Sequence, residues 1–278
     1  MGEGLIRTAR EADLVRLMVG RAIEQVFPKR DVAIGDVVLE VEGLGNPTEF
    51  ADIGFHLHKG EILGFYGLIG AGRSETMQAL FGISRPTSGR VRLEGRELMI
   101  TEPADAIAAG IAYVPEDRQR EGAIGALGIR ENVTLASLGR HLRSRFLSRR
   151  SELAATRDLG ARLAVKAAHW EQRLLELSGG NQQKVVIAKW LATRPRVLIL
   201  DEPTKGIDIG SKAAVHELMG GLAAQGLAII LISSELPEVM GMADRILVMR
   251  EGRQVAEFAR GTADAAAIVT AATGGSAP

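Results

Sequence analysis

The sequence has no cysteine among its 278 residues, only 4% aromatic side chains and no excess of either charge. Without cysteine the chain has no disulfide framework, no thiolate zinc site and no cysteine nucleophile. The 34 basic and 34 acidic side chains cancel, so nucleic acid or anionic lipid could be held only by a local patch. Several enzyme classes and the uniformly basic binding proteins are therefore excluded.

Long hydrophobic runs are also missing. Runs such as residues 227–232 are far shorter than the roughly 20 residues that cross a bilayer. The N-terminus lacks the basic and then apolar pattern of a secretion signal. We therefore expect a soluble chain that is not exported, and any work at a membrane would need another protein as its anchor.

The pattern of residues predicts an N-terminal helix and linker, a large central domain and a short tail. Residues 11–25 have a helical period, and the proline and glycine of residues 27–35 end it. We place the helix and linker over residues 1–35, the domain over 36–262 and an Ala-rich tail with a frayed end over 263–278.

Short β-rich segments alternate with helical ones from residue 37 onward, which is typical of an α/β domain. The continuously apolar segments predict parallel strands that are covered on both faces. Between about residues 125 and 180 the strand signal disappears, and this predicts a helical insert. The expected strands are residues 37–41, 62–66, 111–114, 197–200, 228–232 and 245–249.

A glycine-rich loop lies between the strand expected at residues 62–66 and a helix-compatible segment. Phosphate binding needs bare backbone N–H groups, glycines that allow a tight curl, and a helix N-terminus. Ser74 stands where the P-loop pattern places a hydroxyl ligand of Mg²⁺. The expected nucleotide-binding residues are Gly67, Gly70, Ala71, Gly72, Arg73, Ser74 and Glu75.

Arg73 departs from the P-loop pattern, which has lysine at this place. The charge is kept, but a guanidinium is a wide planar fork, whereas lysine brings a compact ammonium to the β and γ oxygens. Binding can persist while hydrolysis suffers. Taken alone, this loop is also compatible with a strand-to-helix turn without chemical consequence.

Two adjacent carboxylates, Asp201 and Glu202, follow four hydrophobic residues at the end of an expected strand. A buried strand would deliver Asp201 to the carboxyl edge of the sheet, where it could hold Mg²⁺ together with Ser74. Glu202, one residue further, could polarise an attacking water as the catalytic residue. A surface pair without function is a poor alternative in this position.

A second glycine motif, Leu177-Ser-Gly-Gly180, opens another expected helix. Ser178 can cap that helix, while Gly179 and Gly180 leave its positive end bare. This predicts a second anion site on a different element. One chain rarely needs two cradles for a γ-phosphate.

Four motifs resemble, in order and spacing, an ATP-binding cassette domain over about residues 37–260: the P-loop, Leu-Ser-Gly-Gly, Asp201-Glu-Pro-Thr204 and Gly206-Ile-Asp208. The resemblance implies an α/β P-loop NTPase fold with a mostly parallel core sheet, an antiparallel β portion and a helical insert. It also implies ATP and Mg²⁺ as cofactors. In that family the Leu-Ser-Gly-Gly element covers ATP on an opposing cassette, which would explain the two cradles.

The same resemblance implies roles for further residues. Those expected to face the partner's ATP are Ser178, Gly179, Gly180 and Gln182, and Asp208 takes the D-loop place. Active cassettes carry a glutamine where Glu116 stands and a histidine at the switch position, where Ser234 stands. The adenine-stacking aromatic is missing, since Phe50 fits a core position better.

Finer details resemble the second, C-terminal cassette of the fused double-cassette ATPases of ribose-, galactose- and xylose-type importers. They imply an ATPase for monosaccharide uptake, in the cytoplasm on the inner face of the membrane. The implied partners are a preceding cassette, permease subunits and, indirectly, a substrate-binding protein, without nucleic acid. The segments concerned are Gly67-Leu-Ile-Gly-Ala-Gly-Arg73, Tyr113-Val-Pro-Glu-Asp-Arg118, Leu177-Ser-Gly-Gly-Asn-Gln-Gln-Lys184, Thr204-Lys-Gly-Ile-Asp-Ile-Gly210 and Ser233-Ser-Glu-Leu-Pro-Glu-Val239.

Four departures from active cassettes predict an asymmetric mechanism: Arg73, Glu116, Ser234 and the missing adenine-stacking aromatic. The chain's own P-loop site would be weak or inactive and would hold nucleotide mainly as a structural clamp, although Glu202 leaves some hydrolysis. Its intact Leu-Ser-Gly-Gly element would serve ATP on the partner. Two alternatives stay open: a regulatory cassette without turnover, and an importer ATPase for a nucleoside or a related small molecule. The neutral charge disfavours a cassette acting on nucleic acid or ribosomes.

Three other features favour structural interpretations. The basic stretch 138–150 has apolar residues at helical spacing and predicts a solvated helical face rather than a membrane or RNA site. His56 and His58 lack a third ligand and are expected to be exposed. Trp170 and Trp190 are expected to fill the core or an interface.

Overall fold

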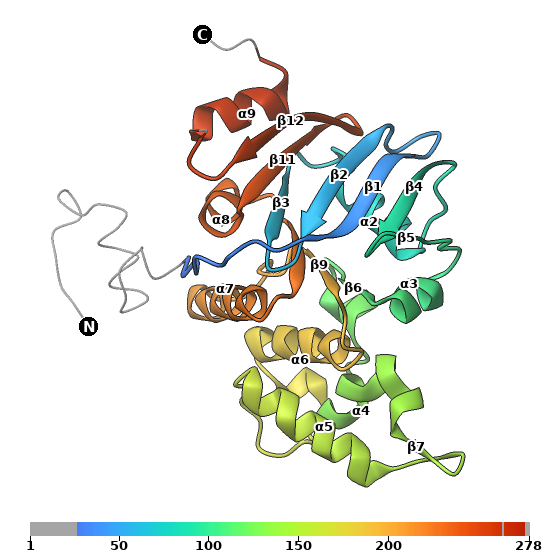
Figure 1. Ribbon diagram of the computed structural model, residues 1–278. Coiled ribbons are helices and arrows are strands. Elements are labelled where there is room, and N and C mark those ends of the chain that lie inside the picture. Colours follow the sequence, from blue (N-terminus) through green and yellow to red (C-terminus); the bar gives the residue numbers. More distant parts are fainter. Residues whose placement is uncertain (1–26, 263, 276–278) are drawn as a thin grey trace, which may run out of the picture.

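The computed structural model describes residues 27–262 and 264–275 (Figure 1). The helix predicted over residues 11–25 lies outside them. Two sheets with their helices form one part of the molecule, and a mainly helical part lies beside them (Figure 1). No helix within the described ranges has the length and hydropathy needed to cross a membrane.

A six-stranded sheet forms the centre, in the order β12-β11-β3-β10-β9-β6. Five strands are parallel, and β12 is antiparallel to β11. Every residue of β3, β6, β9 and β10 is buried, as predicted for continuous apolar strands. Five of the six predicted strands lie in this sheet with bounds within one residue of those predicted, and the sixth, residues 37–41, begins the antiparallel β1. The strands are β3 (Ile62–Tyr66), β6 (Ile111–Val114), β9 (Val197–Asp201), β10 (Ala228–Ile232), β11 (Arg245–Arg250) and β12 (Arg253–Ala259).

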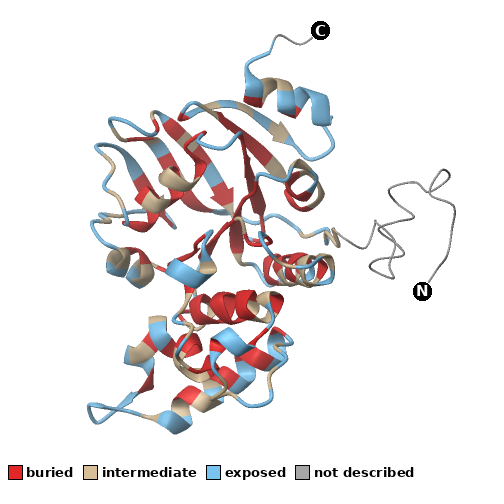
Figure 2. Cartoon of the chain, turned by 180° about the vertical axis from the view of Figure 1, so that it is seen from behind, coloured by how far each residue is buried: buried red, intermediate tan, exposed pale blue. Residues whose placement is uncertain are grey.

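Helices pack against this sheet. α2, α3 and α6 contact β6, α7 contacts β10, α8 contacts β3, and α9 contacts β11. Figure 2 shows buried residues concentrated in the central strands and in α6. The helices are α2 (Arg73–Phe81), α3 (Pro103–Ala109), α6 (Gly179–Leu191), α7 (Ile209–Ala224), α8 (Leu236–Met242) and α9 (Ala265–Thr273).

The Ala-rich tail contains one of these helices, which the sequence analysis did not predict. Asp264 caps α9 by accepting a hydrogen bond from the backbone N–H of Ala267. Ile268 and Ala272 are buried in a small apolar cluster with Tyr66 and Val248. Burial of one helix face therefore fixes this segment against the sheet.

An antiparallel sheet of four strands, β2-β1-β4-β5, packs beside the central sheet. The ring of Phe55 in β2 packs edge to face against the ring of Phe65 in β3, with 5.2 Å between the ring centroids, and this contact joins the two sheets. Phe50 is buried, which confirms its predicted core position. The strands are β1 (Val37–Gly45), β2 (Ile53–His58), β4 (Ser88–Leu93) and β5 (Arg96–Glu97).

The histidine prediction is half right. His56 is exposed, but His58 is only partly exposed, and its Nδ1 lies 2.8 Å from Glu61. The tryptophan prediction is confirmed: Trp190 is buried edge-on against Phe81, and Trp170 packs against the core.

The helical part contains α4, α5 and the start of α6 (Figure 1). The helical face predicted over residues 138–150 is wrong in its middle: residues 138–141 and 149–150 are helical, but the chain between them turns into a hairpin of β7 and β8. Ser144 and Arg145 have φ of 46° and 75°, values that no right-handed helix contains. The elements are η3 (Arg118–Gly122), α4 (Ile129–Thr134), η4 (Leu135–His141), β7 (Leu142–Arg143), β8 (Phe146–Leu147), α5 (Arg149–Arg162) and η5 (Leu174–Glu176).

Candidate functional site

The glycine loop between β3 and α2 has the backbone that an anion cradle needs. Gly70 and Gly72 have φ of 80° and 89°, which is left-handed backbone that favours glycine. A Cβ at Gly67 would lie 2.4 Å from the carbonyl oxygen of Met249, so only glycine fits there. No side chain caps α2, and its first N–H groups are left for a ligand.

A cavity of about 280 Å³ opens over this loop. It lies where β3, β6, β9 and β10 end, because parallel strands present their carboxyl ends at one edge. The structure thus brings most of the predicted nucleotide-binding residues together with the positions expected to act on the γ-phosphate. The lining residues are Ile69, Gly70, Ala71, Gly72, Arg73, Ser74, Glu75, Gln78, Glu116, Glu202, Lys205 and Ser234.

Asp201 ends β9 at this edge and is fully buried. Its Oδ1 accepts a hydrogen bond from Ser74 Oγ at 3.1 Å, and its Oδ2 accepts one from the hydroxyl of Tyr113 at 2.8 Å. Burial raises the pKa of Asp201 from 3.8 to about 6. A hydroxyl and a carboxylate oxygen are hard donors that fit Mg²⁺. Tyr113 was not among the predicted site residues, although it begins the segment Tyr113-Val-Pro-Glu-Asp-Arg118.

Asp201→Asn should remove a pH dependence of folding stability. Since the pKa of Asp201 is raised on folding, its stabilising contribution is complete below about pH 4 and is lost as the pH rises past about 6. A shift of about two units corresponds to about 3 kcal/mol. Through this group, the free energy of unfolding of the nucleotide-free chain should fall by up to that amount toward neutral pH.

Urea unfolding at about pH 4.5 and pH 7.5 measures this effect. The difference in unfolding free energy between Asp201→Asn and the unaltered chain should move in favour of the variant at the higher pH. Asp158→Asn, at an exposed acid on α5, is the matched control and should show no such change. A pH-independent difference for Asp201→Asn would contradict the assignment.

Glu202 is already engaged by its neighbours. Its Oε1 accepts from the backbone N–H of Ser234 at 2.8 Å, and its Oε2 accepts from Ser234 Oγ at 3.2 Å. Arg73 Nη1 lies 3.7 Å from Oε1, and both side chains are at most 10% exposed. Burial raises the pKa of Glu202 above its ordinary value. Arg73 and Ser234 therefore both contact the carboxylate that is expected to act on water.

Glu116 is exposed and paired with Lys205 Nζ. This hydrogen bond raises the pKa of Lys205. A carboxylate stands here in place of the glutamine of active cassettes, and its charge is offset by Lys205, a cation for which no role was predicted. In the sequence, only the position of Lys205 pointed to a role at the site: it lies four residues after Asp201, in the segment Thr204-Lys-Gly-Ile-Asp-Ile-Gly210.

The second glycine motif lies at the start of α6, and its residues do not line the P-loop cavity. Ser178 is the exposed N-cap residue, but its hydroxyl accepts from Asn181 Nδ2 at 2.9 Å and makes no capping bond to the backbone. The first N–H groups of α6 are therefore open. Gly180 is buried, and a Cβ there would lie 2.2 Å from Ser211 Oγ.

Two predicted residues of this surface are occupied within the chain. Gln182 is buried, and its Nε2 donates to the carbonyl oxygen of Leu177 at 3.0 Å, so its side chain supports the loop and does not face outward. Asp208 caps α7 by accepting from the backbone N–H and the hydroxyl of Ser211, which lowers the pKa of Asp208.

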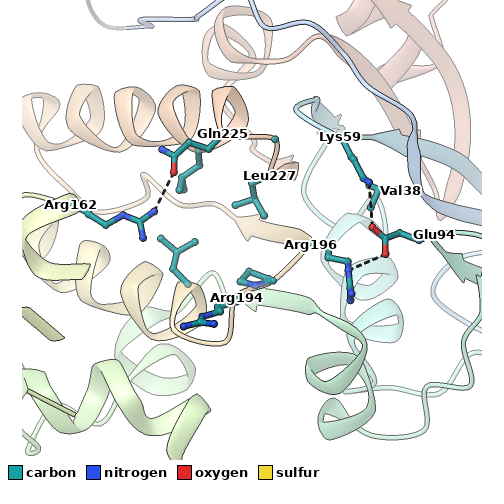
Figure 3. Close-up of a pocket in the computed structure, with 12 residues that line it drawn as sticks. Val38, Lys59, Glu94, Arg162, Arg194, Arg196, Gln225 and Leu227 are labelled. Atoms are coloured by element: carbon teal, nitrogen blue, oxygen red, sulfur yellow. Dashed lines mark hydrogen bonds and ion pairs between the residues drawn. The ribbon is translucent and has the colours of Figure 1, made fainter. Parts of the chain in front are cut away.

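A second cavity, of about 360 Å³, lies at the opposite edge of the sheet, near the start of β9 and β10 (Figure 3). Glu94 there pairs with Lys59 at 3.4 Å and with Arg196 at 3.1 Å, and Arg162 donates to Gln225. None of the predicted site residues lines it. The candidate site is therefore the P-loop edge.

Known proteins resemble the chain in fold and in sequence. An ATP-binding cassette of an ABC transporter in its ADP conformation matches with a TM-score of 0.72 and 20% identity, over 86% of this chain and 95% of that one. The ribose import ATP-binding protein RbsA 1 of Rhizobium meliloti is 60% identical over 99% of this chain and 54% of its own length. RbsA of Jannaschia sp. is 58% identical over 99% and 53%.

The chain thus spans about half the length of these curated relatives. The sequence profile described as ABC transporter matches residues 50–205, which is more than half of the chain. The glycine loop, the acidic end of β9 and the open start of α6 all fall within that match. The chain belongs to the ABC transporter family.

Proposed function

We propose that this chain is the C-terminal ATP-binding cassette of an importer that couples ATP binding and hydrolysis to the uptake of ribose or a related monosaccharide. It works in the cytoplasm at the inner face of the membrane, with a second cassette, permease subunits and, indirectly, a substrate-binding protein. Relatives that are named ribose import ATP-binding proteins support the substrate class. The quoted segments 113–118 and 233–239 support the cassette position.

The P-loop holds the nucleotide phosphates in this proposal. Backbone N–H groups of residues 70–74 and the open start of α2 supply the anion site. Ser74 Oγ and the carboxylate of Asp201 would hold Mg²⁺, which neutralises charge on the phosphate oxygens when it is bound. Ser74 Oγ donates to Asp201 Oδ1 at 3.1 Å, so the two proposed ligands already lie side by side.

We base slow ATP hydrolysis at this site on the contacts that Glu202 makes with Ser234 and Arg73. A general base must bring an oxygen within hydrogen-bond reach of the attacking water, and donors already bound to that oxygen compete with the water. Here Ser234 donates to both carboxylate oxygens, and Arg73 lies beside one of them. The start of α6, by contrast, is open, and its exposed Ser178 and bare N–H groups suit a γ-phosphate brought by another cassette.

The isolated chain should therefore bind Mg-ATP weakly and hydrolyse it slowly. We expect turnover at least 100-fold below the roughly 10 per second that is the median for enzymes. Steady-state phosphate release from the purified chain measures it, and Glu202→Gln corrects for contaminating ATPases. Turnover near the enzyme median that Glu202→Gln abolishes would overturn the proposal of a degenerate site.

A further inference from the structure

We propose that Arg118 is a positioning residue that holds together the two elements offered to the partner's nucleotide: the loop of residues 205–208 and the start of α6. The inference rests on the proposed function, since it needs these elements to act on a partner site. It assigns a role to a side chain that neither touches the P-loop cavity nor belongs to the Leu-Ser-Gly-Gly motif.

The guanidinium of Arg118 bonds the loop directly. Its Nη1 donates to the carbonyl oxygen of Lys205 at 2.9 Å, and its Nη2 donates to the carbonyl oxygen of Gly206 at 3.2 Å. Gly206 has a φ of 68°, so the chain makes a tight turn at this point, two residues before the cap of α7. Two donors of one planar group thus fix two successive carbonyls.

The same guanidinium lies against the first residue of α6. A Cβ at Gly179 would lie 2.9 Å from Arg118 Nη2, 3.5 Å from Ile207 Cγ2 and 3.6 Å from the carbonyl oxygen of Gly206. The bare backbone of Gly179, the loop and the arginine therefore meet at one point. A displacement of Arg118 would change the spacing between the loop and the helix start.

The backbone around Arg118 is held by hydrogen bonds at both ends of its turn. It begins the π-helical turn η3, an uncommon element that is frequent at functional sites. The carboxylate of Asp117 accepts from the backbone N–H groups of Gln119 and Arg120 at one end of the turn. At the other end, the carbonyl oxygen of Gly122 accepts from Lys189 Nζ of α6.

The segment just before the turn lines the P-loop cavity. Glu116, two residues before Arg118, lines that cavity and pairs with Lys205. The segment 116–122 therefore contacts the P-loop cavity, the loop after β9 and the helix start. A nucleotide that displaced Lys205 from Glu116 would act on the same loop that Arg118 holds.

The chemistry requires arginine. Its planar fork donates in two directions at once, whereas the ammonium of lysine is a point charge on a flexible stem. Arg118 Nε is buried and has no hydrogen-bond acceptor among the described residues. Such an unpaired donor costs stability, which favours a positioning role over a purely stabilising one.

The test is carried out on the reconstituted transporter. We expect Arg118→Ala to lower kcat for ATP at least tenfold and to leave KM within twofold. Nucleotide affinity and Tm of the isolated chain should stay near those of the unaltered protein. Arg118→Lys should recover kcat only in part. Arg120→Ala, at an exposed arginine on the same turn, is the matched control and should retain full turnover.

Ser178→Asp, measured in parallel, separates the inference from the proposed function. If Ser178→Asp abolishes turnover while Arg118→Ala keeps full kcat, the positioning role is wrong and the proposed function stands. If both variants keep full turnover, the proposed function is wrong and the inference falls with it. A loss of kcat in Arg118→Ala that only matches a loss of folded protein would also overturn the positioning role.

Discussion

Ser178→Asp is expected to lower ATP turnover of the assembled transporter roughly 100-fold or more, as loss of one transition-state contact typically does. The nucleotide affinity of the isolated chain should stay within about twofold. Aspartate is a favourable N-cap and suits the positive end of α6, so the fold is not weakened. The new carboxylate would, however, stand between this helix end and the γ-phosphate on the partner and would repel it.

Ser178→Asn is the matched control, because asparagine has nearly the same shape as aspartate but carries no charge. It should lose far less turnover than Ser178→Asp. Gly180→Asp is less suitable, because a Cβ at Gly180 would lie 2.2 Å from Ser211 Oγ and would disturb the packing of α6 on α7. Arg73→Ala should weaken nucleotide binding by this chain and lower transporter turnover only in part. If Arg73→Ala abolished turnover and Ser178→Asp did not, the two sites would have the reverse roles.

The triple variant Arg73→Lys, Glu116→Gln, Ser234→His should hydrolyse ATP at least about tenfold faster, as the isolated chain, than Arg73→Lys alone. General-base catalysis contributes typically 10²–10⁴-fold. Releasing one oxygen of Glu202 from the Ser234 hydroxyl should therefore have a large effect, although the backbone N–H of residue 234 keeps its bond to the other oxygen. In the structure, Ser234 Oγ donates to Glu202 and Glu116 binds Lys205, and a change at position 73 alone leaves both contacts in place.

Single-turnover and steady-state phosphate release from the purified variants measure this gain. Adding Glu202→Gln to the triple variant should abolish it, which shows that the activity belongs to this site. Equal rates for the single and the triple variant would contradict the account of several joint defects. They would leave Arg73 as the sole cause of slow hydrolysis.

Much of the fold could be predicted because its signals are local. Continuous apolar runs predicted the parallel strands, and β3, β6 and β10 have the predicted bounds. The antiparallel strands β4, β5 and β12 were not placed, since their exposed and charged residues give no apolar run. The hairpin at residues 142–147 was taken for helix, because two leucines and a phenylalanine fell at helical spacing across a turn.

The sequence by itself determined the chemistry available at the site: the glycines of the loop, the paired acids after β9, and the absence of a P-loop lysine. Tertiary structure alone decided how these groups engage one another. Ser234 contacts Glu202 across 32 residues, Lys205 contacts Glu116 across 89, and Arg118 contacts Lys205 across 87. Local patterns cannot encode such pairs, because they arise only when separate parallel strands bring their carboxyl ends to one edge of the sheet.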